Sequence, residues 1–178
     1  MKLGLALLSF LVWTSAQAQV ALVTDLSGTA NLSGKAGPLA ILSEIERDTQ
    51  VRLEGELAVL YYASGEEYRF RGPALIAFEH TAPRVLQGTP PKIAQQAKQV
   101  ALKPGGVVPA TFVMRTSVPK ELRAKIEAAR PKAGASVSER VAFAAWLEQM
   151  ELRDEARAYW KALASERPDS QKLKELSR

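Results

Sequence analysis

Cysteine is absent from this chain of 178 residues, and histidine occurs once, at His80. The lack of cysteine excludes disulfides, thiolate metal sites and a cysteine nucleophile. A single histidine with no cysteine companions argues against a transition-metal site, so we predict neither a metal nor a cofactor. Beyond residue 18 no apolar run approaches the roughly 20 residues of a membrane-spanning helix. We therefore predict that the mature protein does not span a membrane.

The first eighteen residues have the pattern of a secretory leader. Lys2 provides a positive start, the run Leu3 to Trp13 is apolar, and Ala16-Gln17-Ala18 is a small-x-small cleavage site. We predict cleavage after Ala18 and a periplasmic or secreted protein. Retention of the leader as an uncleaved anchor is the alternative, although its apolar run is too short to cross the hydrocarbon core as a helix.

Charge is distributed unevenly along the chain. Residues 20–80 hold five basic and nine acidic side chains, whereas residues 84–132 hold ten basic and two acidic ones. Residues 136–178 hold eight of each. The basic character of the protein therefore belongs to its middle segment.

The pattern of apolar residues predicts an α+β protein with strands first and helices last. Residues 19–82 contain short β-branched and apolar runs, and Glu67 to Arg71 alternates strictly, which predicts a half-buried strand with Tyr68 and Phe70 facing the core. Gly28 interrupts the first run and indicates a bulge. Gly72-Pro73 ends the alternating strand, because proline cannot donate to a ladder.

Prolines repeatedly break the middle segment, residues 83–135, which we interpret as a basic connector. It contains a possible short helix over Lys92 to Leu102, a strand over Val107 to Met114 that would add to the sheet, and a helix from Pro119 to Ala129. Residues 136–178 form a helical hairpin with a trailing helix. Ser136 and Glu139 have the spacing of a capping box there.

The β-segment resembles the FecR-like domain of bacterial envelope proteins. The likeness lies in Val23-Thr-Asp-Leu-Ser-Gly28-Thr-Ala30, Asp48-Thr49, Ala58-Val-Leu-Tyr-Tyr-Ala-Ser-Gly65-Glu and Tyr68-Arg-Phe-Arg-Gly72-Pro73-Ala74. It covers about one third of the chain, and Arg47 stands where the family usually has the glycine of a Gly-Asp pair. The resemblance implies a small extracytoplasmic β-module that contacts a protein or a polymer.

The segment from Arg140 to Pro168 is similar to a single tetratricopeptide hairpin. Small residues at Ala144 and Ala156, Trp160 and the closing Pro168 carry the likeness, whereas the usual glycines are missing. One such unit cannot bury its apolar stripe alone. The hairpin therefore needs another surface, from this chain or from a partner.

The motifs of common enzymes are missing. Ser64-Gly65 lacks the flanking pattern of a nucleophile elbow, and Lys103-Pro-Gly-Gly106 lacks the ending of a phosphate loop. Glu66 and Glu67 are interpreted as a solvated hairpin turn. They do not read as an acid/base pair, because adjacent strand residues point to opposite faces. We therefore predict a protein that is not an enzyme, with no catalytic residues.

Two sets of residues are candidates for binding. The basic set could meet an anionic partner such as cell-wall polymer or an acidic surface, or it is simply solvated; it comprises Lys92, Lys98, Lys103, Arg115, Lys120, Arg123 and Lys125. The aromatic set is either core or a protein interface; it comprises Trp146, Tyr159 and Trp160. Phe112 is the only aromatic residue of the connector, so a platform for stacking nucleic-acid bases is not expected. The leading hypothesis is an adaptor that binds another envelope protein, and binding of a polyanion or glycan through the connector is the alternative.

Overall fold

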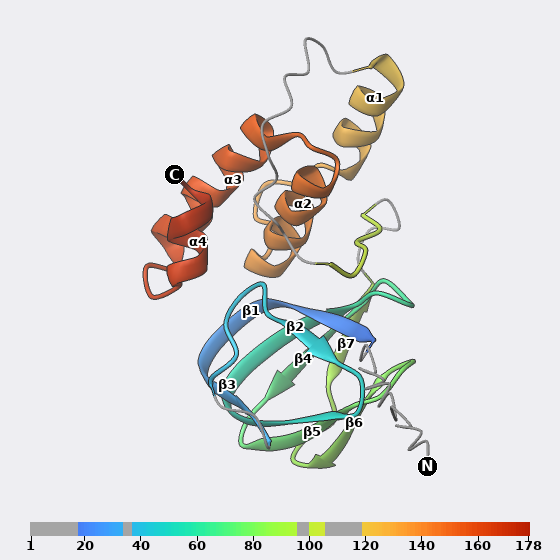
Figure 1. The fold of residues 1–178 in the computed structure, drawn as a ribbon, viewed down its shortest axis with the longest axis vertical. Coiled ribbons are helices and arrows are strands. Elements are labelled where there is room, and N and C mark those ends of the chain that lie inside the picture. Colours follow the sequence, from blue (N-terminus) through green and yellow to red (C-terminus); the bar gives the residue numbers. More distant parts are fainter. Residues whose placement is uncertain (1–17, 34–36, 96–99, 106–118) are drawn as a thin grey trace, which may run out of the picture.

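A computed structural model of the chain describes residues 18–33, 37–95, 100–105 and 119–178. These residues form an antiparallel sheet followed by helices, so the α+β class is confirmed (Figure 1). The strands are β1 (Gln19–Leu32), β2 (Glu44–Glu46), β3 (Thr49–Tyr61), β4 (Glu66–Arg71), β5 (Ala74–Phe78), β6 (Pro83–Gln87) and β7 (Lys92–Gln95). The helices are α1 (Lys120–Ala129), α2 (Val137–Gln149), α3 (Arg153–Glu166) and α4 (Gln171–Leu176).

The long strand β3 organises the sheet. It pairs with β1 along one side, while its other side pairs first with β5 and then with β4. The strand order is β2-β1-β3-β4-β7, and β6 extends the branch through β5. Gly72-Pro73 lies at the corner between β4 and β5, as expected from the sequence.

The expected bulge lies at Thr24 and not at Gly28. The register between β1 and β3 shifts between Val23 and Asp25. Gly28 instead pairs directly with Gly55, and both have positive φ. A Cβ at Gly28 would lie 2.2 Å from the carbonyl oxygen of Glu54, so glycine is needed for the close approach of these two strands.

The rolled sheet encloses one apolar core. Tyr68 and Phe70 are buried while Arg69 and Arg71 are exposed, which confirms the alternation predicted for β4. The rings of Tyr61 and Tyr68 meet edge to face at 5.3 Å, and Phe78 contacts both Tyr61 and Phe70. Aromatic packing of this kind adds to the stabilisation from burial alone.

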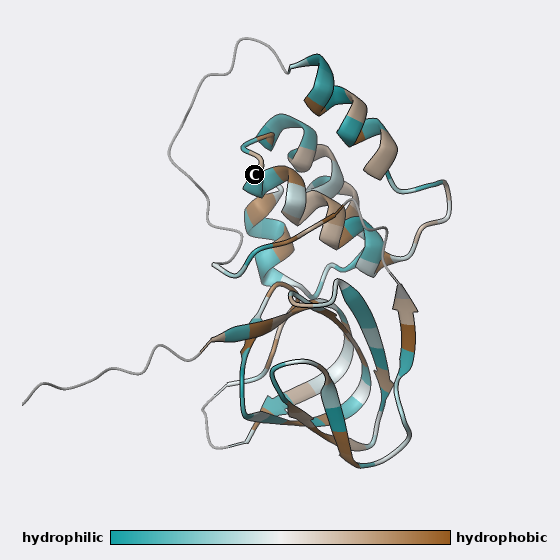
Figure 2. Cartoon of the chain, turned by 90° about the vertical axis from the view of Figure 1, so that its right-hand side faces the viewer, coloured by the Kyte–Doolittle hydropathy of each residue, from teal (hydrophilic) through white to brown (hydrophobic). Residues whose placement is uncertain are grey.

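A second core lies where the helices meet one end of the sheet, as Figures 1 and 2 both show. Helix α2 is central to it and is buried continuously from Val141 to Leu147. Leu22 and Leu60 reach this core from the sheet, and Val100 and Leu102 reach it from the segment that precedes α1. The hairpin therefore buries its apolar stripe against its own chain.

Local helix signals are confirmed. Ser136 and Glu139 form the capping box, and α1 covers the interval predicted from Pro119 to Ala129. Helix α3 ends at Glu166, before Pro168, and Ser170 caps α4 by accepting a hydrogen bond from the Leu173 amide. These ends are set by neighbouring residues, which explains why the sequence predicts them well.

The middle segment differs from the prediction. The sheet continues past the expected boundary at residue 82, because β6 pairs with β5 and β7 pairs with β4. Residues 92–95 are a strand and not the start of a helix. Pairing with β4 provides hydrogen bonds for their backbone groups, whereas a short isolated helix is only marginally stable. The predicted strand over Val107 to Met114 lies outside the described residues. In the part of the chain that is described, no helix is long and apolar enough to cross a membrane.

Candidate binding groove between sheet and helices

Two rows of side chains cross the outer face of the sheet. The first row follows the strand register from Asp25 through Ala58 and Arg69 to Lys92. The second row runs from Ser27 through Glu56 to Arg71. Because residues paired across strands point to the same face, the rows form one charged surface.

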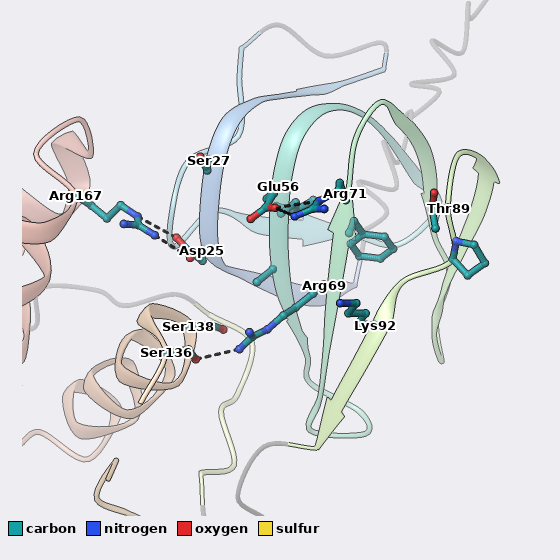
Figure 3. Close-up of a pocket in the computed structure, with 14 residues that line it drawn as sticks. Asp25, Ser27, Glu56, Arg69, Arg71, Thr89, Lys92, Ser136, Ser138 and Arg167 are labelled. Atoms are coloured by element: carbon teal, nitrogen blue, oxygen red, sulfur yellow. Dashed lines mark hydrogen bonds and ion pairs between the residues drawn. The ribbon is translucent and has the colours of Figure 1, made fainter. Parts of the chain in front are cut away.

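This surface is the floor of a groove of about 540 Å³. Ser136, Ser138 and Arg167 from the helical part contribute one side, and Thr89 and Pro90 from the β6–β7 connection contribute to the lining as well. Figure 3 shows Arg167 and Ser136 on one side of the floor and Thr89 and Lys92 on the other. The groove is therefore built jointly by the sheet and the helices.

A half-buried ion pair joins the helices to the floor. The guanidinium of Arg167, after α3, donates to both carboxylate oxygens of Asp25 on β1, at 3.2 and 3.1 Å (Figure 3). Two parallel hydrogen bonds fix the relative orientation of the two groups more strongly than a single contact does. Arg167 is thus held at the edge of the groove.

A buried polar cluster lies behind the groove. Ser138 Oγ lies 2.6 Å from Glu67 Oε2 and 2.6 Å from Thr24 Oγ1. The Arg69 guanidinium binds the other oxygen of Glu67 and donates to Ser136 Oγ at 3.0 Å. The hydrogen bond from Glu67 raises the pKa of Arg69 above its usual value, against the opposing effect of burial. Arg69 is therefore a fixed cation that touches both the sheet and α2.

Glu67 corrects the sequence interpretation. It was expected in a solvated turn, yet its side chain is only 1% exposed. The reason is the docking of α2 against β1 and β3, which brings Ser138 onto the carboxylate of Glu67. Strict alternation in β4 placed Glu67 on the polar face of that strand, but no local pattern could show that a helix covers it.

The described members of the basic set lie on different elements. Lys92 lines the groove, whereas the backbone of Lys103 is hydrogen-bonded to Gln149 at the end of α2. The exposed side chains of Lys120, Arg123 and Lys125 lie on α1. Lys98 and Arg115 lie outside the described residues.

The aromatic set belongs largely to the helical core. Trp160 is fully buried and its indole N–H donates to Glu148 Oε1 at 3.1 Å; Trp146 is 7% exposed. Tyr159 is half-buried against Phe143, with ring centroids 5.0 Å apart. Burial of both tryptophans in the helical core favours the core interpretation, and the interface alternative stays a prediction.

Residues with metal-ligating side chains do not cluster. Within the described ranges there is no group of three or more histidine, cysteine, aspartate or glutamate residues that could hold an ion. His80 is exposed between β5 and β6 and does not line the groove. Among the described residues the candidate site is thus the groove, which is lined largely by charged and polar side chains.

Comparisons with models of known protein families, with curated proteins and with solved structures found no match. The resemblances to a FecR-like domain and to a tetratricopeptide hairpin therefore stay predictions from the sequence.

Proposed function

We propose that this chain is a non-enzymatic adaptor of the bacterial envelope and that the groove between sheet and helices is its binding site for another envelope protein. The observation that carries the proposal is the joint construction of the groove. Its floor comes from β1, β3, β4 and β7, while Ser136, Ser138 and Arg167 come from the helical part. A concave site between two docked units is a common place for recognition.

The charges of the groove support binding. Arg167 is held by Asp25, and Arg69 is held by Glu67. Side chains held in this way lose little freedom when a partner arrives, which lowers the entropic cost of association. The cations lining the groove outnumber its carboxylates, Asp25 and Glu56, so an acidic partner surface fits best.

The leader pattern and the FecR-like resemblance support an envelope location. Both favour a location outside the cytoplasm, where a protein partner or a cell-wall polymer is accessible. The large apolar residues of the helical hairpin are already packed in the core. The helices are therefore a less suitable docking surface than the groove.

Cross-linking in cells tests the proposal. A tagged chain is cross-linked in the envelope, purified at low and high salt, and its partners are identified by mass spectrometry. We expect one dominant protein, lost in the groove-filling variant Thr89→Trp and retained in the matched control Ala128→Trp on α1. Equal recovery with both variants would place the binding site elsewhere.

The polyanion alternative is favoured by one observation only. Helix α1 exposes Lys120, Arg123 and Lys125, and such a helix can attract an anionic polymer. Polyanion binding through α1 predicts that cell-wall fragments are captured at low salt and lost at high salt. It also predicts loss of capture when these three residues are neutralised, with Thr89→Trp having no effect.

A further inference from the structure

Among the strands that the structure describes, β7 is the last on one side of the sheet, beside the groove. It ends the path β2-β1-β3-β4-β7 and pairs with β4. Among residues 18–33, 37–95, 100–105 and 119–178, no second strand pairs with it. An edge strand presents backbone N–H and C=O groups that can pair with another extended chain.

Ile93 lies at the centre of this edge and is unusual in its exposure. Its side chain is 59% exposed and is the only exposed large hydrophobic within the described ranges. Its partner across the ladder, Tyr68, is buried. Charged residues such as Lys92 usually protect edges. Ile93 instead leaves the face shared with Tyr68 apolar and exposed, and we interpret it as a surface suited to contact.

Lys92 gives the edge a charge preference. It lies directly opposite Arg69 in the ladder between β4 and β7. Arg69 is bound to Glu67, whereas Lys92 has no ion pair with any residue that the structure describes. Like charges facing each other across strands are unfavourable, so an acidic side chain on the other side of Lys92 would be stabilising.

We propose that the partner adds an extended segment to β7 as a further strand, with an acidic residue beside Lys92 and an apolar residue next to it in sequence beside Ile93. Successive strand residues point to opposite faces, so the acid lies on the groove face and the apolar residue on the face of Tyr68. This inference rests on the proposed function, since it names how the partner of the groove is held.

Charge argues for a different protein over a second copy of this chain. Pairing two β7 strands would bring a second Lys92, together with its neighbours Arg69 and Arg71, to the same edge. That arrangement adds cations beside Arg69 and Lys92, which already end the first row of side chains on the groove floor. An acidic strand instead continues the row with the opposite charge.

Binding of a short labelled peptide in which glutamate and valine alternate tests the inference, measured by fluorescence anisotropy on the full chain. We expect Ile93→Lys to weaken binding more than about tenfold, because a charge on the edge opposes strand addition. Lys92→Gln should weaken it about two- to fivefold, the range of one cross-strand charge pair. Lys125→Gln on α1 is the matched control and should leave affinity unchanged, as should the mild variant Ile93→Val.

A peptide in which lysine replaces glutamate should bind wild-type protein weakly or not at all. Absence of binding of the acidic peptide, or equal binding to wild-type and Ile93→Lys proteins, would overturn the inference. So would a wild-type dimer in sedimentation that Ile93→Lys dissociates, since β7 would then be occupied by a second copy. Retention of the cellular partner by Ile93→Lys, with its loss in Thr89→Trp, would overturn strand addition while leaving the adaptor function standing.

Discussion

Ser138 and Glu67 share a buried hydrogen bond of 2.6 Å although 71 positions separate them in the chain. The contact joins the first turn of α2 to the polar face of β4. It lies directly behind the groove and holds the two units that form it. The docking of sheet and helices is thus specified by polar contacts as well as by the shared apolar core.

Ser138→Ala removes that contact and leaves a buried carboxylate with one donor fewer. We expect a loss of about 1–3 kcal/mol in the free energy of unfolding, because a buried acceptor loses one of its donors. Urea denaturation followed by circular dichroism measures it. Ser165→Ala, whose hydroxyl is exposed on α3, is the matched control and should cost less than about 0.5 kcal/mol. Equal losses of stability in the two variants would mean that the buried hydrogen bond of Ser138 contributes no more than the exposed one of Ser165.

The ion pair of Arg167 and Asp25 should contribute more than the exposed pair of Arg71 and Glu56. Both residues of the first pair are about 30% exposed (30% and 28%), whereas those of the second are 80% and 60% exposed. Double-mutant cycles with alanine should give a coupling energy near 1 kcal/mol for the first pair and close to zero for the second, because exposed pairs are screened by solvent. A larger coupling for Arg71 and Glu56 would contradict this ranking.

Alkaline pH should destabilise the β-core through its tyrosines. Burial raises the pKa of Tyr68 to about 12 from the ordinary value of 10.0, with the hydrogen bond to Glu66 adding to the shift. Burial also raises the pKa of Tyr61 in the same core, and of Tyr62, which packs against the helical core. Since the unfolded chain ionises first, the stabilisation is fully present below pH 10 and is lost as pH rises towards 12. Phenolate absorbance during a pH titration should rise together with unfolding, and early ionisation in the folded state would count against burial of these rings.

The side chain of Trp160 should contribute to the stability of the fold and not to partner binding. Trp160→Ala is expected to cost about 3–5 kcal/mol, because it opens a cavity in the helical core. The milder Trp160→Phe keeps most of the volume and loses the hydrogen bond to Glu148, so it should remain folded and retain the partner in the cross-linking assay. A folded Trp160→Phe protein that loses the partner would restore the interface interpretation.

Features fixed by near neighbours were predictable from the sequence. The capping box of Ser136 and Glu139, the extent of α1 and the alternation of Tyr68 and Phe70 all follow from local patterns. Strand β7 was missed because it has four residues, too few for a period to separate strand from helix.

The candidate site was predictable only in part. Lys92 was singled out by its charge, whereas Asp25, Arg69 and Arg167 were not. Their proximity depends on the register of three strands and on the docking of the helices, which no short pattern encodes. The excess of basic residues in the connector also did not identify the candidate site. Its described basic residues lie on different elements, and only Lys92 lines the groove.

Photo-cross-linking from the groove tests the central claim most directly. A photoreactive amino acid replaces the exposed Thr89, and in a matched strain it replaces the exposed Ala128 on α1. After illumination of intact cells, the account predicts a discrete adduct with one envelope protein from position 89 and none from position 128. An adduct from position 128 alone, or no adduct from either position, would contradict the assignment of the groove as the partner-binding site.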